Sequence, residues 1–414
     1  KIPGGCPPPA TTTPRAGCSP PPPEEETGPR RTPPLASTRR CVTDDVAAPG
    51  PSTAIGTTTH GGSDGTIRAV PAATGGRCAP PGGGGGGGPP AIAIRRDRLQ
   101  RVLHDAIPAA VERRFGATVV GATVDDANDG RVSLDVAATS ADDAAAAKTT
   151  TTYGPFDLVV GCDGVGSSVE ALLFPRPARA EASGIRVLFG VAEFAPDRPP
   201  ARTARDAFHQ YLGDGAYCLS ASYGADTDML AVCYKEDGTE DARDSWRVAS
   251  DDKRDKARAL LTAAGLLGGS TGGADTELAA VLDAATRFYD APVSFFNPVG
   301  RAWRAGRAVL CGDAAHAMPP FLGQGANQAI SDAWALADRL ARCRGDADSL
   351  ARAADAYYAA RAFPTARLLV NSRFLGFIET QAGLGALARN AFFATTGKLG
   401  IAERVFLDGA TPRL

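Results

Sequence analysis

The feature that most constrains this chain is the string CGDAAHAMPPFLGQGAN at residues 311–327, which lies between an apolar run and a helical pattern. The apolar run, residues 307–311, is typical of a buried parallel strand. Gly312 and Asp313 then fall at the carboxyl end of that strand, where α/β sheets bind ligands. A carboxylate there accepts hydrogen bonds from ligand hydroxyls, and glycine lets a ligand approach the backbone closely. The string therefore predicts a ligand site, with Asp313 as its first candidate residue.

The second half of the string predicts a turn and then a helix. Pro319 and Pro320 stop any preceding helix, and Gly323 and Gly325 are free to adopt positive φ angles and to offer backbone N–H groups. Apolar residues then recur at the spacing of an amphipathic helix. They are Ile330, Ala333, Trp334, Ala337, Leu340 and Ala341. The alternative is a plain strand-turn-helix corner with a solvated aspartate, which is less favoured because the string is long and specific.

At these residues the chain resembles the flavin-dependent aromatic hydroxylase and epoxidase superfamily, to which p-hydroxybenzoate hydroxylase, salicylate hydroxylase and zeaxanthin epoxidase belong. The resemblance implies that the Gly-Asp segment binds the ribityl chain of FAD and that the following residues border the isoalloxazine ring. The cofactor-binding residues implied in this string are Gly312, Asp313, Pro319, Gly323, Gly325, Ala326 and Asn327. The positive end of the predicted helix also suits the electron-rich pyrimidine edge of a reduced flavin.

A second string, residues 157–170, supports the resemblance. A hydrophobic strand ends in Asp163 and Gly164, and Ser167 is placed to cap the helix that follows. The string is similar to the superfamily's second signature, which contacts flavin and the nicotinamide cofactor, so Asp163 and Gly164 are implied cofactor-binding residues. Glu170 stands where the superfamily usually has arginine. Because the charge is reversed, the resemblance supports FAD binding more firmly than NAD(P)H binding.

A third string, residues 92–103, has the pattern of a strand end followed by a helix. Its resemblance to the superfamily places Arg96 where an arginine contacts the flavin. The alternative for Arg96 is a solvated charge among Arg95, Arg98 and Arg101. Together with the other two strings, the flavin contact is favoured.

The superfamily normally opens with a strand, the spacing Gly-x-Gly-x-x-Gly and a helix, whose amides hold the pyrophosphate of FAD. No such pattern occurs in residues 1–90, which are dense in proline and glycine and contain an unbroken glycine run at 82–88. Such a composition buries too little apolar surface to offset chain entropy, so we expect disorder there. Three origins stay open for this segment: the end of a fragment, an incorrect gene model, or a transit peptide.

Composition favours a soluble intracellular protein, with organelle targeting left open. The formal net charge of −2 argues against a nucleic-acid partner, and no apolar run reaches the length of a transmembrane span. The nine cysteines include no Cys-x-x-Cys pair, so we expect reduced and inert thiols. Four scattered histidines argue against a metal site.

These patterns predict an α/β fold, namely an incomplete Rossmann-like FAD-binding lobe with an inserted antiparallel-sheet substrate domain and C-terminal helices. The first part of the lobe would be residues 91–174 and the second part residues 301–345. The substrate domain, residues 175–300, contains strand-like runs separated by glycine-rich turns. The runs are 187–194, 208–213, 216–223 and 229–234, with covering helices expected at 251–264 and 275–287.

Residues 346–414 have apolar residues at helical spacing, and we expect helices at 347–366 and 367–406. These helices would pack on the flavin lobe or on a second subunit. Peripheral membrane contact is the alternative for one apolar set, although burial explains such residues more often. The set is Phe374, Leu375, Phe377, Ile378, Phe392 and Phe393.

The resemblance implies an FAD-dependent, NAD(P)H-using monooxygenase that hydroxylates or epoxidises an aromatic or alkene-containing small molecule with O2, through a flavin C4a-hydroperoxide. In this chemistry the flavin is the reacting group, so no catalytic residue is assigned, and His209 and His316 are not expected to act as catalytic bases. Two alternatives stay open: a non-catalytic remnant that does not retain FAD, and a related flavoprotein reductase. The pattern assigns no particular substrate and no oligomeric state.

Overall fold

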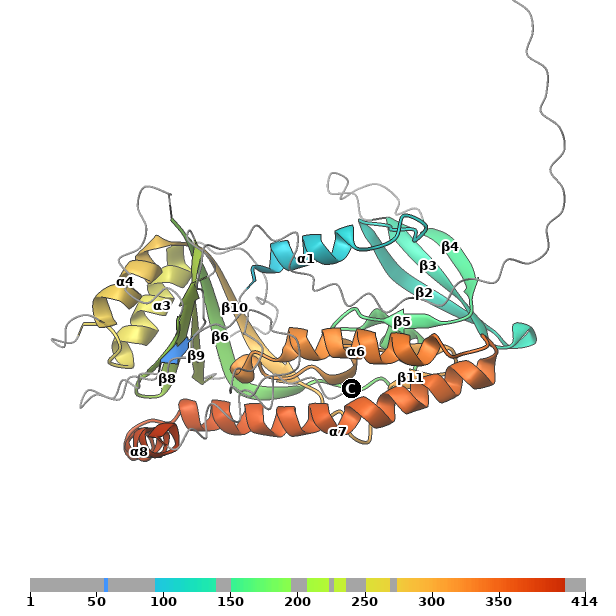
Figure 1. The fold of residues 1–414 in the computed structure, drawn as a ribbon. Coiled ribbons are helices and arrows are strands. Elements are labelled where there is room, and N and C mark those ends of the chain that lie inside the picture. The colour runs from blue at the N-terminus through green and yellow to red at the C-terminus, as the bar shows by residue number, and fades with distance from the viewer. Residues whose placement is uncertain are drawn as a thin grey trace, which may run out of the picture. The chain divides into compact units, whose positions relative to one another are not determined.

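The computed structural model describes residues 56–58, 94–138, 150–194, 207–222, 227–235, 251–268 and 274–398 (Figure 1). Three β-sheets and the helices packed against them make up this part of the chain. The prediction of disorder in residues 1–90 lies outside the described residues, except at β1 (Gly56–Thr58), which pairs in parallel with β7 (Ala207–Leu212). No helix in the described ranges is both long and apolar enough to cross a membrane.

The largest sheet has the strand order β1-β7-β8-β9-β6-β10, and each neighbouring pair except β1 with β7 is antiparallel. Its remaining strands are β6 (Glu181–Glu193), β8 (Ala216–Ser222), β9 (Thr227–Lys235) and β10 (Ala285–Phe295). The predicted antiparallel sheet is confirmed. The sequence did not predict β10, because this strand begins directly where a helix ends, with no glycine or proline between them.

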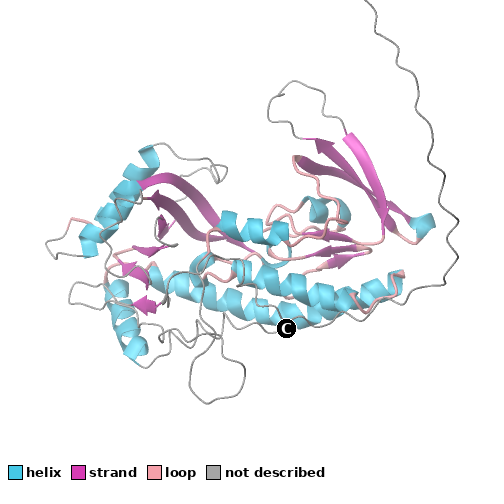
Figure 2. Ribbon diagram, turned by 45° about the horizontal axis from the view of Figure 1, so that its top comes forward, coloured by secondary structure: helices cyan, strands magenta, loops and turns pink. Residues whose placement is uncertain are grey.

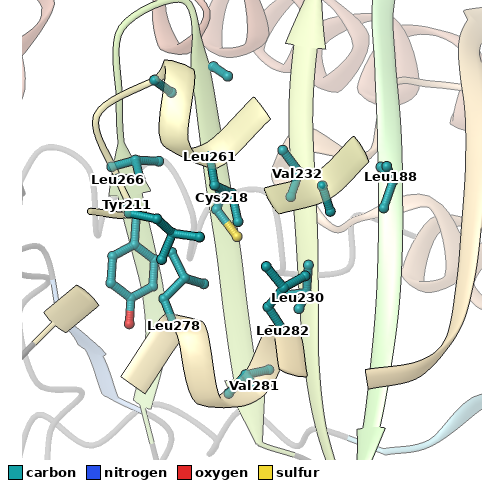
Figure 3. Close-up of a cluster of buried hydrophobic side chains, with 14 of the residues drawn as sticks. Leu188, Tyr211, Cys218, Leu230, Val232, Leu261, Leu266, Leu278, Val281 and Leu282 are labelled. Atoms are coloured by element: carbon teal, nitrogen blue, oxygen red, sulfur yellow. The ribbon is translucent and has the colours of Figure 1, made fainter. Parts of the chain in front are cut away.

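Helices α3 (Asp251–Ala263) and α4 (Ala274–Ala284) cover one face of this sheet, as predicted. Leucine and alanine side chains make up most of the buried core between these helices and the strands, part of which Figure 3 shows. Alternation along β8 sends neighbouring side chains to opposite faces. Cys218 therefore enters this helix-side core, whereas Tyr217 enters a second core on the other face, together with Phe321.

A small sheet brings the two strongest sequence strings together. Its strands are β11 (Arg304–Ala305), β12 (Ala308–Leu310) and β5 (Val159–Gly161), and β12 runs parallel to β5 with Leu310 opposite Gly161. Both strands end where the Cys-Asp-Gly and Cys-Gly-Asp sequences begin, which confirms both predicted strands. Helices α2 (Ser168–Leu173), α5 (Asp313–His316) and α6 (Gly325–Leu340) follow from these ends.

A third sheet, β2 (Ala117–Asp125), β3 (Arg131–Ala138) and β4 (Thr150–Phe156), is antiparallel and was not predicted. A short 3-10 turn, η1 (Asp126–Asn128), joins β2 to β3, and α1 (Arg96–Asp105) precedes β2. Most positions of β2 and β4 are exposed or half-buried, so their sequences lack the apolar alternation that marks a half-buried strand.

The predicted division into helices at 347–366 and 367–406 is wrong, because α7 (Ala347–Glu379) continues through Pro364 as one helix, and α8 (Leu384–Lys398) follows. Proline removes one backbone donor from a helix. Buried residues on both sides of Pro364, including Ala362 and Thr365, pack against the rest of the protein and hold the helix in place. Figures 1 and 2 show α7 running alongside α6.

Candidate functional site

The Gly312 turn lies between β12 and α5 at the carboxyl end of the small sheet. Gly312 has φ 62° and ψ −138°, a conformation that residues with a side chain rarely adopt. A Cβ built on Gly312 would lie 3.2 Å from the Cβ of Ala329 on α6. The turn therefore requires glycine both for its backbone angles and for its close approach to α6.

Asp313 begins α5 and is exposed. Its Oδ1 atom lies 3.9 Å from the position that a Cβ on Gly325 would take. Gly325 is the first residue of α6, so the Asp313 carboxylate faces the N-terminal end of that helix. The structure thus brings Asp313 and Gly325, which are twelve residues apart in the string, next to each other. The exposed Asp313 carboxylate lies beside the first amides of α6.

The Pro-rich part of the string forms a fixed turn. Pro319 is buried, and its carbonyl accepts a hydrogen bond from the Ser372 hydroxyl at 2.7 Å. The 3-10 turn η2 (Pro320–Leu322) follows, and Gly323 ends it with φ 63°, which confirms the predicted positive φ. The same prediction is wrong for Gly325, which is helical, because α6 starts one residue after Gln324.

The N-terminus of α6 carries no side-chain cap, so its first amides are not occupied by a capping oxygen. The Asn327 side chain instead donates to Oε1 of buried Gln324 at 3.0 Å. Ala326 and Asn327 are exposed. Uncapped amides at the positive end of a helix favour acceptor groups of a ligand.

A buried polar network centred on Asp332 of α6 holds the Gly312 turn in place. Asp332 is fully buried. Its carboxylate accepts hydrogen bonds from the Gly312 amide at 3.0 Å and from the Arg361 Nε atom at 2.7 Å. It also pairs with Nε2 of His316. Arg361 also donates to Oε1 of Gln328 at 2.6 Å. Burial raises the pKa of Asp332, but the partners His316 and Arg361 outweigh it, so the pKa lies below its ordinary value.

The apolar spacing predicted that the stripe of Ile330, Ala333, Trp334 and Ala337 would be the buried side of α6. This prediction is wrong, because the stripe is exposed. Ile330 and Trp334 are 48% and 53% exposed, and Ala333 and Ala337 are exposed with them. The buried side instead carries three polar residues and two apolar ones. Its members are Gln328, Ser331, Asp332, Ala335 and Leu336. Hydrogen bonding to the Gly312 turn and to α7 decides which face is buried, and periodicity alone could not show that.

The second string forms the predicted helix cap. Ser167 accepts from the Glu170 amide at 3.0 Å, which confirms it as the N-cap of α2. Asp163 accepts from the Ser167 hydroxyl and the Ser168 amide, both at 2.6 Å. The Asp163 carboxylate is thus engaged with the start of α2, while Gly164, at φ 82°, turns the chain beside it.

Glu170 is 4% exposed and forms an ion pair with Arg301 at 2.6 Å. Arg301 also donates to the carbonyl of Ala315 in α5 at 2.8 Å and lies over the ring of Phe296. This pair connects the two signature segments. Sequence reasoning noted the charge of Glu170 but missed Arg301, which is far away in the chain and belongs to no motif.

Arg96 lies on the exposed side of α1, and within the described residues no hydrogen bond joins it to the Gly312 turn. Its neighbour Arg95 makes the tertiary contacts of this segment, donating to Thr227 at 3.3 Å and pairing with Glu193 at 3.7 Å. The predicted flavin contact of Arg96 therefore stays a prediction, and Arg95 is the residue that joins α1 to the large sheet.

A cavity of about 500 Å³ opens between the start of β6, η2 and the second half of α7. Phe321, Phe374 and Phe377 give it apolar walls, and Lys235 and Arg373 also line it. Phe374 and Phe377 are largely exposed, whereas Leu375, Ile378 and Phe393 pack on the core around Tyr217, so core packing is confirmed for those three only. Among the described side chains no cluster could hold a metal ion.

Comparison with known proteins supports the resemblance at the 311–327 string, which lies inside the matched residues. Residues 291–372 match the family model described as FAD binding domain. Zeaxanthin epoxidase of Solanum lycopersicum is 30% identical over 253 residues, which is 61% of this chain and 34% of that protein. The phenazine 1,6-dicarboxylic acid hydroxylase PhzS of Lysobacter antibioticus is 32% identical over 290 residues, covering 68% of this chain and 65% of that protein. The chain thus spans about a third of the length of the zeaxanthin epoxidases that it matches.

Among solved structures, Klebsiella pneumoniae HpxO complexed with FAD and uric acid shares the fold, with a TM-score of 0.55, 21% identity, and coverage of 76% of this chain and 70% of that one. The residues present suit a flavin. The uncapped amides of α6 can donate to the carbonyl oxygens of its ring, and the exposed carboxylate of Asp313 can accept from its ribityl hydroxyls. The Gly312 turn, which has no room for a Cβ, lets the ligand come close to the backbone. Residues 291–372 therefore match the family model described as FAD binding domain, and the chain is similar in sequence to zeaxanthin epoxidase and to the hydroxylase PhzS.

Proposed function

We propose that this chain binds FAD and acts as an FAD-dependent, NAD(P)H-using monooxygenase that hydroxylates or epoxidises an aromatic or alkene-containing small molecule. The observation that carries the proposal is the position of Asp313, whose exposed carboxylate faces the N-terminus of α6 across the Gly312 turn. The family match over residues 291–372 and the activities named for the relatives support it.

Different residues of the chain would bind different parts of the cofactor. Asp313 would accept hydrogen bonds from the ribityl hydroxyls, and the Gly312 turn would let that chain approach the backbone. The amides of Gly325, Ala326 and Asn327 would donate to the carbonyl oxygens of the ring. When bound, FAD supplies the hydride acceptance and the reaction with O2.

The turn and the cavity beside it would position the substrate. The carbonyl of Pro319 is held by Ser372, and Phe321 is buried against Tyr217, with ring centroids 6.4 Å apart, so the turn is rigid. We place the substrate in the cavity next to Phe321, whose aromatic walls suit an apolar molecule.

The charge of Glu170 does not oppose NAD(P)H at this site. Glu170 is buried and its charge is balanced by Arg301 at 2.6 Å, so it offers no free negative charge to an incoming dinucleotide phosphate. Glu170 replaces the arginine usual in the superfamily, and this change of charge argued against NAD(P)H binding from sequence alone. In the structure the negative charge of Glu170 is balanced by the positive charge of Arg301. NAD(P)H remains part of the proposal as the electron donor.

The test begins with the full chain, purified and reconstituted with FAD, and the absorbance of protein-bound flavin after gel filtration. Bound flavin is expected. NADH and NADPH oxidation is then measured with and without candidate aromatic substrates, and oxygen incorporation is followed with labelled O2. Incorporation of label supports a monooxygenase. Oxidation of NAD(P)H without incorporation supports a flavoprotein reductase, and absence of bound flavin supports a remnant without FAD.

A further inference from the structure

Cys162 and Cys311 occupy adjacent positions on two parallel strands. The register of β5 and β12 places Val160 opposite Val309 and Gly161 opposite Leu310, and the Cys311 amide donates to the Gly161 carbonyl at 2.9 Å. The next residues in this register are Cys162 and Cys311. Neighbouring positions on parallel strands point their side chains to the same face of a sheet. The two thiols therefore lie side by side at the carboxyl end of the small sheet.

The spacing is compatible with a disulfide bond. Neighbouring strands lie about 4.8 Å apart, and disulfides join Cα atoms that are about 4.4 to 6.8 Å apart. Both cysteines are free in the structure. The sequence gives no sign of this pair, because the two residues belong to different strings and only the sheet brings them together.

The two thiols differ in access and in acidity. Cys162 is exposed, whereas Cys311 is 6% exposed. A hydrogen bond from the Cys311 thiol lowers the pKa of Cys162 below its ordinary value, although partial burial and the charge of Asp163 act in the opposite direction. The same contact and burial raise the pKa of Cys311. An accessible thiol with a lowered pKa is the one that oxidants attack first.

We propose that Cys162 and Cys311 form an oxidation site at which hydrogen peroxide converts the two thiols into a disulfide. Hydrogen peroxide transfers an oxygen atom to the Cys162 thiolate, which becomes a sulfenic acid as the O–O bond breaks. The Cys311 thiol then attacks that sulfur, the S–S bond forms and the S–O bond breaks, and water leaves. In total two thiols lose two electrons and two protons, and one peroxide is reduced to two waters.

The pair immediately precedes Asp163 on one strand and Gly312 on the other. A disulfide would covalently join the two segments that carry the candidate cofactor residues. The inference does not rest on the proposed function, because the oxidant is added peroxide and the product is read from the polypeptide itself.

The test treats the reduced full chain with hydrogen peroxide at a small molar excess, blocks the remaining thiols and maps disulfide-linked peptides by mass spectrometry. We expect a peptide that links Cys162 to Cys311, and we expect dithiothreitol to reverse it. The linked peptide, not a thiol count, is the readout, because the chain has other cysteines. Cys162→Ser and Cys311→Ser should each abolish it, whereas Cys343→Ser, at a half-buried site elsewhere, should leave it unchanged.

A second measurement keeps the test independent of how the variants fold. The wild-type chain is oxidised in the same way after unfolding in urea, where the sheet no longer holds the pair together. The yield of this linkage should fall at least tenfold relative to the folded chain. An equal yield in folded and unfolded protein would overturn the proposal, as would folded protein in which Cys162 stays unreacted or is oxidised without forming the linkage.

Discussion

Arg301 and Glu170 form a buried ion pair that joins the α2 segment to the carbonyl of Ala315 in α5. Each side chain is less than a tenth exposed. Removing one partner of a buried pair leaves an uncompensated charge, which costs about 3 to 5 kcal/mol. We therefore expect Glu170→Gln to lower the free energy of unfolding by about that amount in urea denaturation.

The matched control is the surface pair Arg304–Asp355, at 2.9 Å, in which Asp355 is 63% exposed. Exposed pairs contribute about 0 to 1 kcal/mol. Asp355→Asn should therefore change the unfolding free energy by less than about 1 kcal/mol. The exchange Glu170→Arg with Arg301→Glu should recover part of the loss seen in either single variant. A Glu170→Gln protein as stable as the wild type would show that the pair does not hold the segments together.

The Asp332 network predicts a specific acid sensitivity. The pKa of Asp332 is lowered in the folded chain, so its ionised form stabilises the fold above the unfolded-state pKa of about 3.9. That contribution is lost as the pH falls below about 4 towards the folded-state value. Asp332→Asn should be less stable than the wild type at pH 7, because the buried Arg361 loses the carboxylate that balances its charge. The difference should shrink below pH 4 in unfolding curves; a difference that is constant with pH would contradict this assignment.

Glu379 predicts the opposite pH dependence. It is 1% exposed, and burial raises its pKa to about 8, although Gln210 donates a hydrogen bond to it. A carboxyl whose pKa is raised by folding stabilises the folded state fully only below its unfolded-state pKa of about 4.3. This contribution to the free energy of unfolding is lost as the pH rises to the folded-state pKa. The wild type should thus lose stability between about pH 4.5 and 8, at up to about 1.4 kcal/mol per pH unit.

Glu379→Gln keeps the shape of the side chain and cannot ionise. Its unfolding free energy should change less over the same pH range, and the two proteins should diverge most near pH 8. Equal slopes for the two proteins in urea titrations would show that Glu379 is already ionised in the folded chain.

Gly312→Ala tests the turn itself. The backbone angles disfavour any side chain, and the new Cβ would meet Ala329 at 3.2 Å. We expect a loss of about 1 to 3 kcal/mol in unfolding free energy. Gly166→Ala is the control, because nothing lies within 4 Å of a Cβ there and its φ is not positive. If both variants were equally stable, the turn would tolerate a side chain and the steric argument would be incorrect.

The sequence predicted most of the regular elements whose apolar pattern is strong. The strands of the large sheet from β6 to β9 are rich in apolar residues, and the two parallel strands of the small sheet, β5 and β12, are short apolar runs that end in glycine-containing turns. The sheet of β2, β3 and β4 was missed because its two outer strands, β2 and β4, are largely exposed and lack a clear apolar alternation. The division expected within α7 was wrong because tertiary packing on both sides of Pro364 carries the helix past it.

The candidate site was predictable where a single segment defines it. The positive φ of Gly323, the Ser167 cap and the helix after the turn all follow from local residue types. The buried side of α6, the partner of Glu170 and the adjacency of the two cysteines were not predictable, because each depends on which distant segment packs there. Asp332 shows the principle: a charged residue on the buried side makes sense only once Arg361 is placed next to it.

The most direct test of the account is FAD binding by the full chain, measured by quenching of flavin fluorescence. We expect saturable binding by the wild type and at least a tenfold weaker affinity for Asp313→Ala, because that carboxylate faces the N-terminus of α6. Asp338→Asn, which removes a carboxylate on α6 that pairs with Arg342 at 2.8 Å, should bind as the wild type does. Absence of binding by the folded wild type, or equal affinity for Asp313→Ala and Asp338→Asn, would contradict the account.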